Sequence, residues 1–125
     1  MLAAARLSDL GVSPEQLIVT TFGAPAVGNA AFARRYEGKF TLRRVVMSGD
    51  PMKDILAKPL GFQQFGERVT WSPARSVAKF PHAMTVYVDA AIRRLCDAYG
   101  GERAYLFLMG TPDRMAGRTL YTLPI

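Results

Sequence analysis

The pattern of apolar and polar residues at the start of the chain is typical of a helix followed by a buried strand. Residues 2–10 are rich in alanine and have leucines at positions 2, 7 and 10, which predicts a helix that ends at Gly11. After a turn at 13–16, residues 17–22 form a mostly apolar, β-prone run. Such a run predicts a strand buried on both faces of a parallel sheet.

A second helix and strand follow in the same order. Asn29 suits a helix N-cap before a short helix at 30–36, which ends at Gly38, and the apolar residues of 42–47 predict a second strand. Helices that alternate with buried strands are typical of a layered α/β fold, with a mostly parallel sheet and flanking helices.

The second half of the chain is expected to contain a hairpin, a long helix and two more strands. The hairpin would pair 62–65 with 67–71, and the helix would run from 82 to 99. Its apolar residues recur along one face at Val88, Ile92, Leu95 and Tyr99. The two further strands are predicted at 104–109 and 119–123.

The length and composition favour one folded domain. The chain has 125 residues, half of them hydrophobic, so we expect a single domain over 1–125. No apolar run approaches the roughly 18 residues of a membrane span, and the first ten residues lack the order of a signal peptide. The single cysteine, Cys96, is interpreted as a small core or boundary residue. No compartment follows from these features.

The net charge of +6 comes mostly from arginine and does not by itself indicate a function. Arginine pairs at 34–35, 43–44 and 93–94 are separated by long neutral stretches, and no nucleic-acid-binding motif accompanies them. We therefore expect no nucleic-acid partner. The charge is compatible with a solvated surface or with weak association with an anionic membrane surface.

Two residues are candidates for chemistry, although each also has an ordinary structural interpretation. Asp50 follows the strand at 42–47 in a Gly-Asp-Pro turn, and His82 is the chain's one histidine. Functional groups of parallel sheets gather at the carboxyl ends of the strands. An aspartate at such an end, followed later by a histidine, matches the order Ser, Asp, His of α/β hydrolases.

Four stretches of the sequence resemble those of a known family and occur in that family's order. They are Thr21-Phe22-Gly23-Ala24-Pro25 with Val27-Gly28-Asn29 and Phe32-Ala33, Arg44-Val45-Val46 leading to Gly49-Asp50-Pro51, Gly61-Phe62 through Gly66 to Trp71, and His82-Ala83-Met84 with Tyr87. In these stretches the chain resembles the C-terminal part of a class 3 lipase, the fungal-lipase-like family of α/β hydrolases. The resemblance covers residues 1 to about 90.

The resemblance implies a lipid ester hydrolase that acts on acylglycerols or similar esters without a metal or organic cofactor. Asp50 would be the triad aspartate and His82 the triad histidine, with residues 20–29 beside the nucleophile. In such a triad the histidine takes the serine proton and returns it to the leaving alcohol, while the aspartate orients the histidine.

The chain departs from the family pattern in two places. Pro51 is followed by Met52-Lys53-Asp54 in place of a second proline, which makes Asp54 a rival to Asp50. No Gly-x-Ser-x-Gly motif occurs, and the three serines that precede Asp50 do not suit a nucleophile elbow. We expect the elbow a few residues upstream of Met1, so this chain alone should be inactive. The alternatives are a non-catalytic remnant that binds an apolar ligand or a partner chain, and a small basic binding module.

Overall fold

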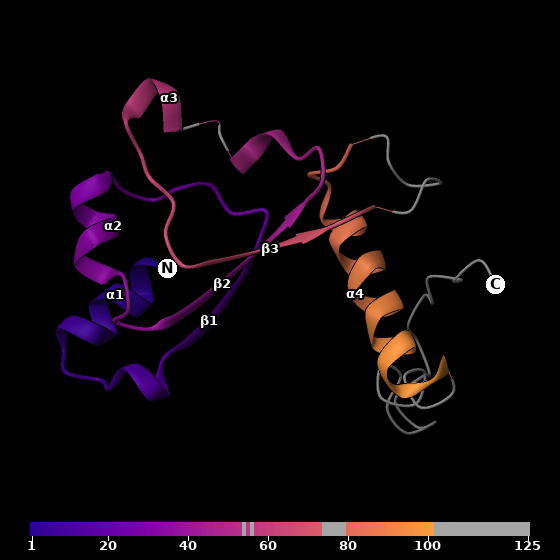
Figure 1. Cartoon of the computed structure of the whole chain (residues 1–125), viewed down its shortest axis with the longest axis horizontal. Coiled ribbons are helices and arrows are strands. Elements are labelled where there is room, and N and C mark those ends of the chain that lie inside the picture. The colour runs from indigo at the N-terminus through magenta and orange to yellow at the C-terminus, as the bar shows by residue number, and fades with distance from the viewer. Residues whose placement is uncertain (54, 56, 74–79, 102–125) are drawn as a thin grey trace, which may run out of the picture. The chain divides into compact units, whose positions relative to one another are not determined.

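The computed structural model describes residues 1–53, 55, 57–73 and 80–101 (Figure 1). The chain divides into two compact units, Met1–Ala90 and Ala91–Ile125, and the sheet and both candidate residues belong to the first. Asp54 and the strands expected at 104–109 and 119–123 lie outside the described residues. The single domain over 1–125 stays a prediction.

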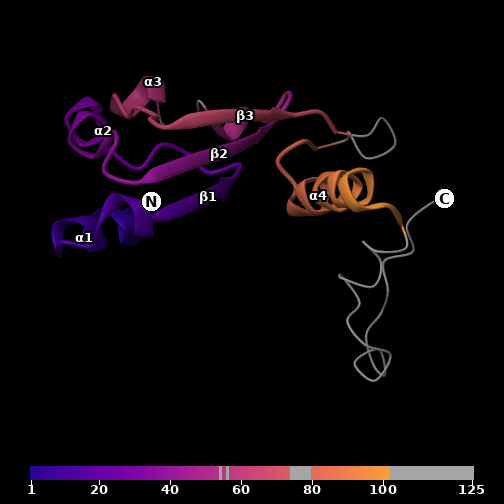
Figure 2. The ribbon, with the colours of Figure 1, turned by 60° about the horizontal axis from the view of Figure 1, so that its bottom comes forward.

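Three parallel strands and their flanking helices form an α/β fold, as expected. The elements in chain order are α1 (Leu2–Asp9), a 3₁₀ helix (Pro14–Gln16), β1 (Ile18–Phe22), α2 (Ala30–Tyr36), β2 (Thr41–Met47), a 3₁₀ helix (Pro51–Lys53), α3 (Ala57–Leu60), β3 (Glu67–Trp71) and α4 (Met84–Tyr99). The sheet order is β1-β2-β3, and both pairings are parallel. Figure 2 shows the three strands side by side.

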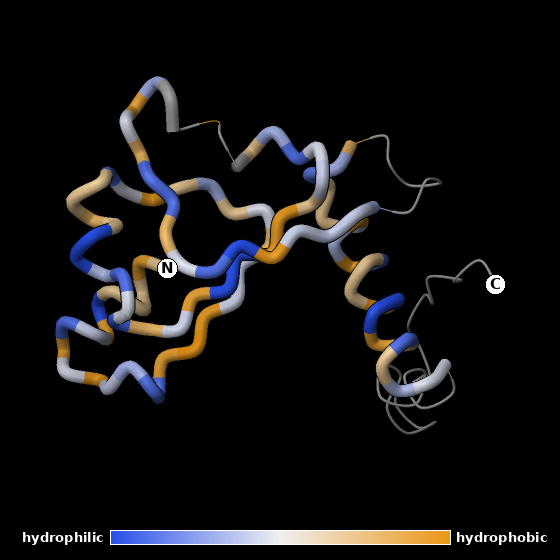
Figure 3. The backbone as a smooth tube through the Cα atoms, in the orientation of Figure 1, coloured by the Kyte–Doolittle hydropathy of each residue, from blue (hydrophilic) through white to orange (hydrophobic). Residues whose placement is uncertain are grey.

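Alternate residues of the strands contribute to two separate hydrophobic clusters. Leu42 of β2 packs in a cluster with residues of α1 and α2, among them Ala5 and Tyr36. Val45 and Met47 pack with Val86, Tyr87 and Ala90 of α4. Figure 3 shows β2 changing from hydrophilic at 43–44 to hydrophobic at 45–47. The second cluster therefore forms at the carboxyl end of β2, just before Asp50.

The prediction that 17–22 is buried on both faces is wrong. Among the described strands, β1 has only β2 as a neighbour, and Ile18 and Phe22 are 73% and 40% exposed. An apolar run indicates a strand that can be buried on both faces, but a face is buried only where another layer packs on it. Exposure alternates along β1, and Val19 packs on the first cluster while Ile18 is exposed, so only one face of this strand is covered by the described residues.

The predicted hairpin of 62–65 with 67–71 is also wrong. β3 pairs in parallel with β2, with Val45 opposite Val69, while Phe62 forms an isolated antiparallel bridge with Asn29. Gly66 alone separates the two segments, whereas even the tightest common hairpins need a two-residue loop. The partner of β3 comes instead from a distant part of the chain.

The long helix begins at Met84 rather than at His82, which lies in the turn before it. Its buried residues are Val86, Tyr87 and Ala90, whereas Val88 and Tyr99 of the predicted apolar face are 46% and 64% exposed. The side of a helix that is buried depends on where it meets the sheet. Among the described helices, none has the length and hydrophobicity of a membrane span.

Candidate active site

Asp50 is held in a tight turn at the carboxyl end of β2. Gly49 takes a φ of 82°, and the Asp50 amide donates a hydrogen bond to the Met47 carbonyl at 3.0 Å. The Asp50 carboxylate is turned inward and the residue is 1% exposed. Its Oδ1 accepts a 2.8 Å hydrogen bond from the Met52 amide. The loop therefore buries a carboxylate at the sheet edge where active sites of such folds form.

His82 reaches this carboxylate from the turn that precedes α4. Its Nδ1 lies 3.0 Å from Asp50 Oδ2, although the two residues are 32 positions apart in the sequence. The His82 side chain is 31% exposed and that of Asp50 is 0% exposed, and the Phe80 ring packs edge-on against the imidazole at 6.2 Å between centroids. With Nδ1–H donated to an ionised Asp50, Nε2 carries the lone pair. Within the described residues, Nε2 has no hydrogen-bond partner.

Tyr87 is a third member of the cluster, and it was not predicted as a site residue. Its hydroxyl donates to Asp50 Oδ2 at 2.6 Å and accepts from the Met47 amide at 2.9 Å. Burial, with a smaller contribution from the hydrogen bond to Asp50, raises the pKa of Tyr87 to about 12. The one signal for Tyr87 in the sequence was its place in the fourth matched stretch, five residues after His82.

The hydrogen bonds around Asp50 keep its carboxyl group ionised. Burial by itself would raise the pKa of Asp50, but the donors Tyr87, His82 and the Met52 amide together outweigh burial and lower this pKa below its usual value. An ionised carboxylate favours the imidazole tautomer with its proton on Nδ1. Nε2 is then available to accept a proton.

Gly23 packs directly against these three side chains. It has a φ of +58°, and a Cβ atom built on it would lie 2.9 Å from the Tyr87 hydroxyl and 3.1 Å from Asp50 Oδ2. The same atom would lie 3.1 Å from His82 Nδ1. The Gly23 amide donates to the Val45 carbonyl at 2.9 Å and so holds the loop after β1 against β2. The Phe-Gly-Ala-Pro stretch thus needs glycine for backbone conformation and for space.

Comparison with known proteins finds one family over the first part of the chain. A family model described as Lipase (class 3) matches residues 1–58. Residues 1–58 are therefore class 3 lipase-like. The match includes Gly23 and Asp50 and ends before His82, which the fold brings to Asp50. No curated protein and no solved structure matches the chain.

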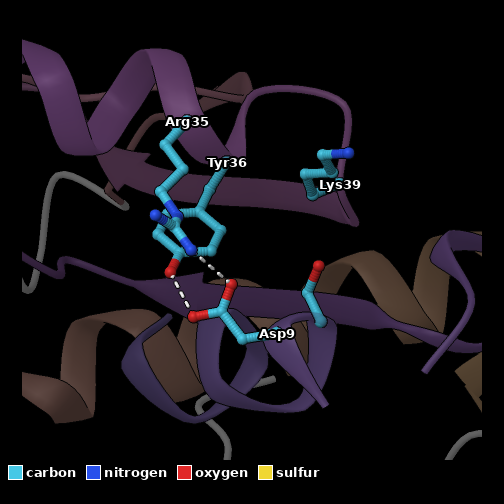
Figure 4. A pocket seen from close by; sticks show the side chains of 5 residues that line it. Asp9, Arg35, Tyr36 and Lys39 are labelled. Carbon is cyan, nitrogen blue, oxygen red and sulfur yellow. Dashed lines mark hydrogen bonds and ion pairs between the residues drawn. The ribbon is translucent and has the colours of Figure 1, made fainter. Parts of the chain in front are cut away.

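A separate polar pocket of the lipase-like segment lies between α1 and α2 (Figure 4). The cavity has a volume of about 320 Å³ and is lined by Ser8, Asp9, Arg35, Tyr36 and Lys39. The Asp9 carboxylate accepts from Arg35 at 3.0 Å and from the Tyr36 hydroxyl at 2.7 Å. Both bonds lower the pKa of Asp9, and the bond from Tyr36 has the larger effect. The cluster ties the two helices together and contains neither candidate residue.

The fold therefore brings together Asp50 and His82, the two residues predicted from the sequence, and adds Tyr87 and Gly23. The rival carboxylate, Asp54, lies outside the described residues. Over the residues with described positions, no three acidic, histidine or cysteine side chains form a metal-binding group.

Proposed function

We propose that the chain carries the aspartate–histidine pair of a lipid ester hydrolase, with Asp50 as the acid and His82 as the general base. The observation that supports this most is the 3.0 Å contact between His82 Nδ1 and Asp50 Oδ2. A buried carboxylate that holds one nitrogen of a partly exposed imidazole is the arrangement a Ser-His-Asp triad requires.

Each residue would have a defined role in ester cleavage. His82 Nε2 removes the proton from a serine hydroxyl as the serine oxygen attacks the ester carbonyl carbon. The tetrahedral intermediate then collapses, and His82 gives the proton to the departing alcohol. Water hydrolyses the acyl-serine by the same proton transfers in the second half of the reaction. Asp50 orients the imidazole and stabilises its protonated form, and neither step requires a metal or an organic cofactor.

The nucleophilic serine belongs to the proposal but not to the described site. Within the described part of the chain, no serine is hydrogen-bonded to His82, and the sequence contains no Gly-x-Ser-x-Gly elbow. In the proposed enzyme an elbow-bearing segment joined to this chain would supply the serine. One oxyanion donor would come with it, from the residue after the nucleophile.

Apolar side chains beside His82 support a lipid ester as the substrate. Phe80 and Met84 flank the histidine in sequence and are 56% and 59% exposed, and the Phe80 ring contacts the imidazole. An apolar acyl group would cover such side chains favourably. The net charge of +6 would add weak attraction to an anionic lipid surface.

The test is an ester-hydrolysis assay on the chain alone and on the chain fused behind an elbow-bearing segment. The elbow-bearing half of a class 3 lipase supplies this segment. We expect the chain alone to hydrolyse short-chain nitrophenyl esters no faster than its His82→Ala variant. The fusion should gain activity that requires His82.

Two aspartate variants of the fusion then test the assignment of the acid. Asp50→Asn should lower kcat by about 10⁴, because the neutral amide favours the wrong imidazole tautomer. Asp54→Asn should cost less than about tenfold, equivalent to roughly 1.4 kcal/mol of barrier. Exchanged effects would make Asp54 the acid, and the absence of any effect from either substitution would refute the proposed function.

A second candidate function is binding of a partner strand. The observation in its favour is the open edge of β1, where Ile18 is 73% exposed and the described strands provide no second neighbour. Such an edge presents free backbone donors and acceptors to another chain.

A further inference from the structure

We infer that Tyr87 is a positioning residue of the proposed hydrolase, and that its hydroxyl holds the Asp50 oxygen to which His82 binds. This inference rests on the proposed function. It assigns to Tyr87 a role that the order Ser, Asp, His does not contain.

A directed chain of hydrogen bonds supports the inference. The Met47 amide donates to the Tyr87 hydroxyl at 2.9 Å, so this oxygen is already used as an acceptor. Its one hydrogen is then committed to Asp50 Oδ2 at 2.6 Å. Met47 and Tyr87 are 0% and 2% exposed, so water does not compete for either bond. Short hydrogen bonds from a neutral donor to a carboxylate are among the stronger ones in proteins.

Each of the two oxygens of Asp50 has its own hydrogen-bond donor. The Met52 amide holds Oδ1 at 2.8 Å, and Tyr87 holds Oδ2. A carboxylate with a single anchor could rotate about its Cβ–Cγ bond, whereas two anchors fix its plane. Within the described residues, Asp50 is the one hydrogen-bond partner of His82. The orientation of the imidazole therefore depends on the plane that Tyr87 and Met52 impose.

A second tyrosine–aspartate pair in the same chain provides a matched control. The Tyr36 hydroxyl donates to Asp9 Oδ2 at 2.7 Å, almost the same distance as in the Tyr87–Asp50 bond. Arg35 is the other side-chain partner of this carboxylate, and no histidine takes part. Tyr36→Phe thus removes an equivalent hydroxyl away from the candidate site.

The experiment follows the carboxyl titrations and the histidine by NMR in the untagged chain. The chain has one histidine, so the imidazole signals need no assignment. Tyr87→Phe should raise the pKa of Asp50 toward its usual value and increase the solvent exchange of the His82 Nδ1 proton. Tyr36→Phe should raise the pKa of Asp9 and leave both signals of the Asp50–His82 pair unchanged.

A fluorinated tyrosine keeps the test decisive if Tyr87→Phe does not fold. 3-Fluorotyrosine at position 87 has nearly the same shape but a more acidic hydroxyl, so it should donate more strongly and lower the pKa of Asp50 further. The inference would be overturned if the pKa of Asp50 were unchanged in every one of these two position-87 variants that folds. The inference would also be overturned if Tyr36→Phe shifted the pKa of Asp50 as much as Tyr87→Phe does.

Kinetics of the fused enzyme separate this inference from the proposed function. Tyr87→Phe should lower kcat roughly tenfold or more, the effect of one hydrogen bond to a charged group, with KM unchanged. A fusion that is inactive with all residues intact would refute the proposed function. An active fusion whose kcat is the same with Phe at position 87 would refute the role of Tyr87 alone.

Discussion

Gly23→Ala should destabilise the chain by disturbing the Asp50–His82–Tyr87 cluster. The added Cβ atom would lie 2.9 Å from the Tyr87 hydroxyl, closer than carbon and oxygen atoms can approach without repulsion. This hydroxyl is held by hydrogen bonds to Met47 and Asp50. It cannot move away without breaking at least one of them.

The size of the effect can be worked out against a second glycine in the same backbone region. Gly38 has a φ of +75° and nothing within 4 Å of its Cβ position. Gly38→Ala should therefore cost only the backbone strain of a left-handed alanine, about 1–2 kcal/mol. Gly23→Ala has a similar backbone strain at a φ of +58°, and overpacking should lower the free energy of unfolding by a further amount of about 1–3 kcal/mol. The difference between the two variants measures the contact with the site.

Urea unfolding of both variants, followed by circular dichroism, gives this difference. We expect Gly23→Ala to be less stable than Gly38→Ala by about 1–3 kcal/mol, with similar dependence on urea. In a thermal melt each kcal/mol of lost stability would lower the Tm by roughly 3–6 °C. If the two variants agree within about 0.5 kcal/mol, the range of ordinary surface substitutions, the close packing of Gly23 against the site is refuted.

Three further predictions concern stability and association. Hydrogen bonds hold the pKa values of Asp50 and Asp9 below their usual range, so the stability they provide is present at neutral pH and is lost as the pH falls below about 4. The urea midpoint of unfolding should therefore fall as the pH is lowered below about 4, and it should fall less steeply with pH in Asp9→Asn. An equally steep fall in both proteins would exclude a contribution from Asp9. Asn29 caps α2 by accepting the Phe32 amide hydrogen at 3.1 Å, so Asn29→Ala should cost about 1 kcal/mol of unfolding free energy while Asn29→Ser retains most of it; equal losses would contradict the cap. Ile18→Lys on the open edge of β1 should increase the monomer fraction in sedimentation, because edge lysines block strand pairing, and an unchanged size distribution would count against this edge as an association site.

Local patterns were enough to predict several elements and both candidate site residues. The helices at α1 and α2 and the strand β2 were predicted because capping, glycine stops and apolar periodicity act over a few neighbouring residues. Asp50 and His82 were predicted from their order along the chain and from the rule that parallel sheets gather functional groups at the carboxyl ends of strands. Family resemblance then added the roles that remain proposals.

Only the tertiary structure decided which distant residues meet. The parallel pairing of β3 with β2 depends on the strands available as neighbours, and the exposure of Ile18 depends on which face of β1 is covered. No local run of residues encodes either one. Tyr87 is 37 positions from Asp50 and 40 from Met47 along the chain, and its helical periodicity is the same whether it packs in a core or bonds a carboxylate. Gly23 likewise has the sequence of an ordinary turn, and the fold alone brings Asp50, His82 and Tyr87 against it. Propensity is a property of neighbouring residues, whereas burial and hydrogen bonding within a site depend on segments far apart in the sequence.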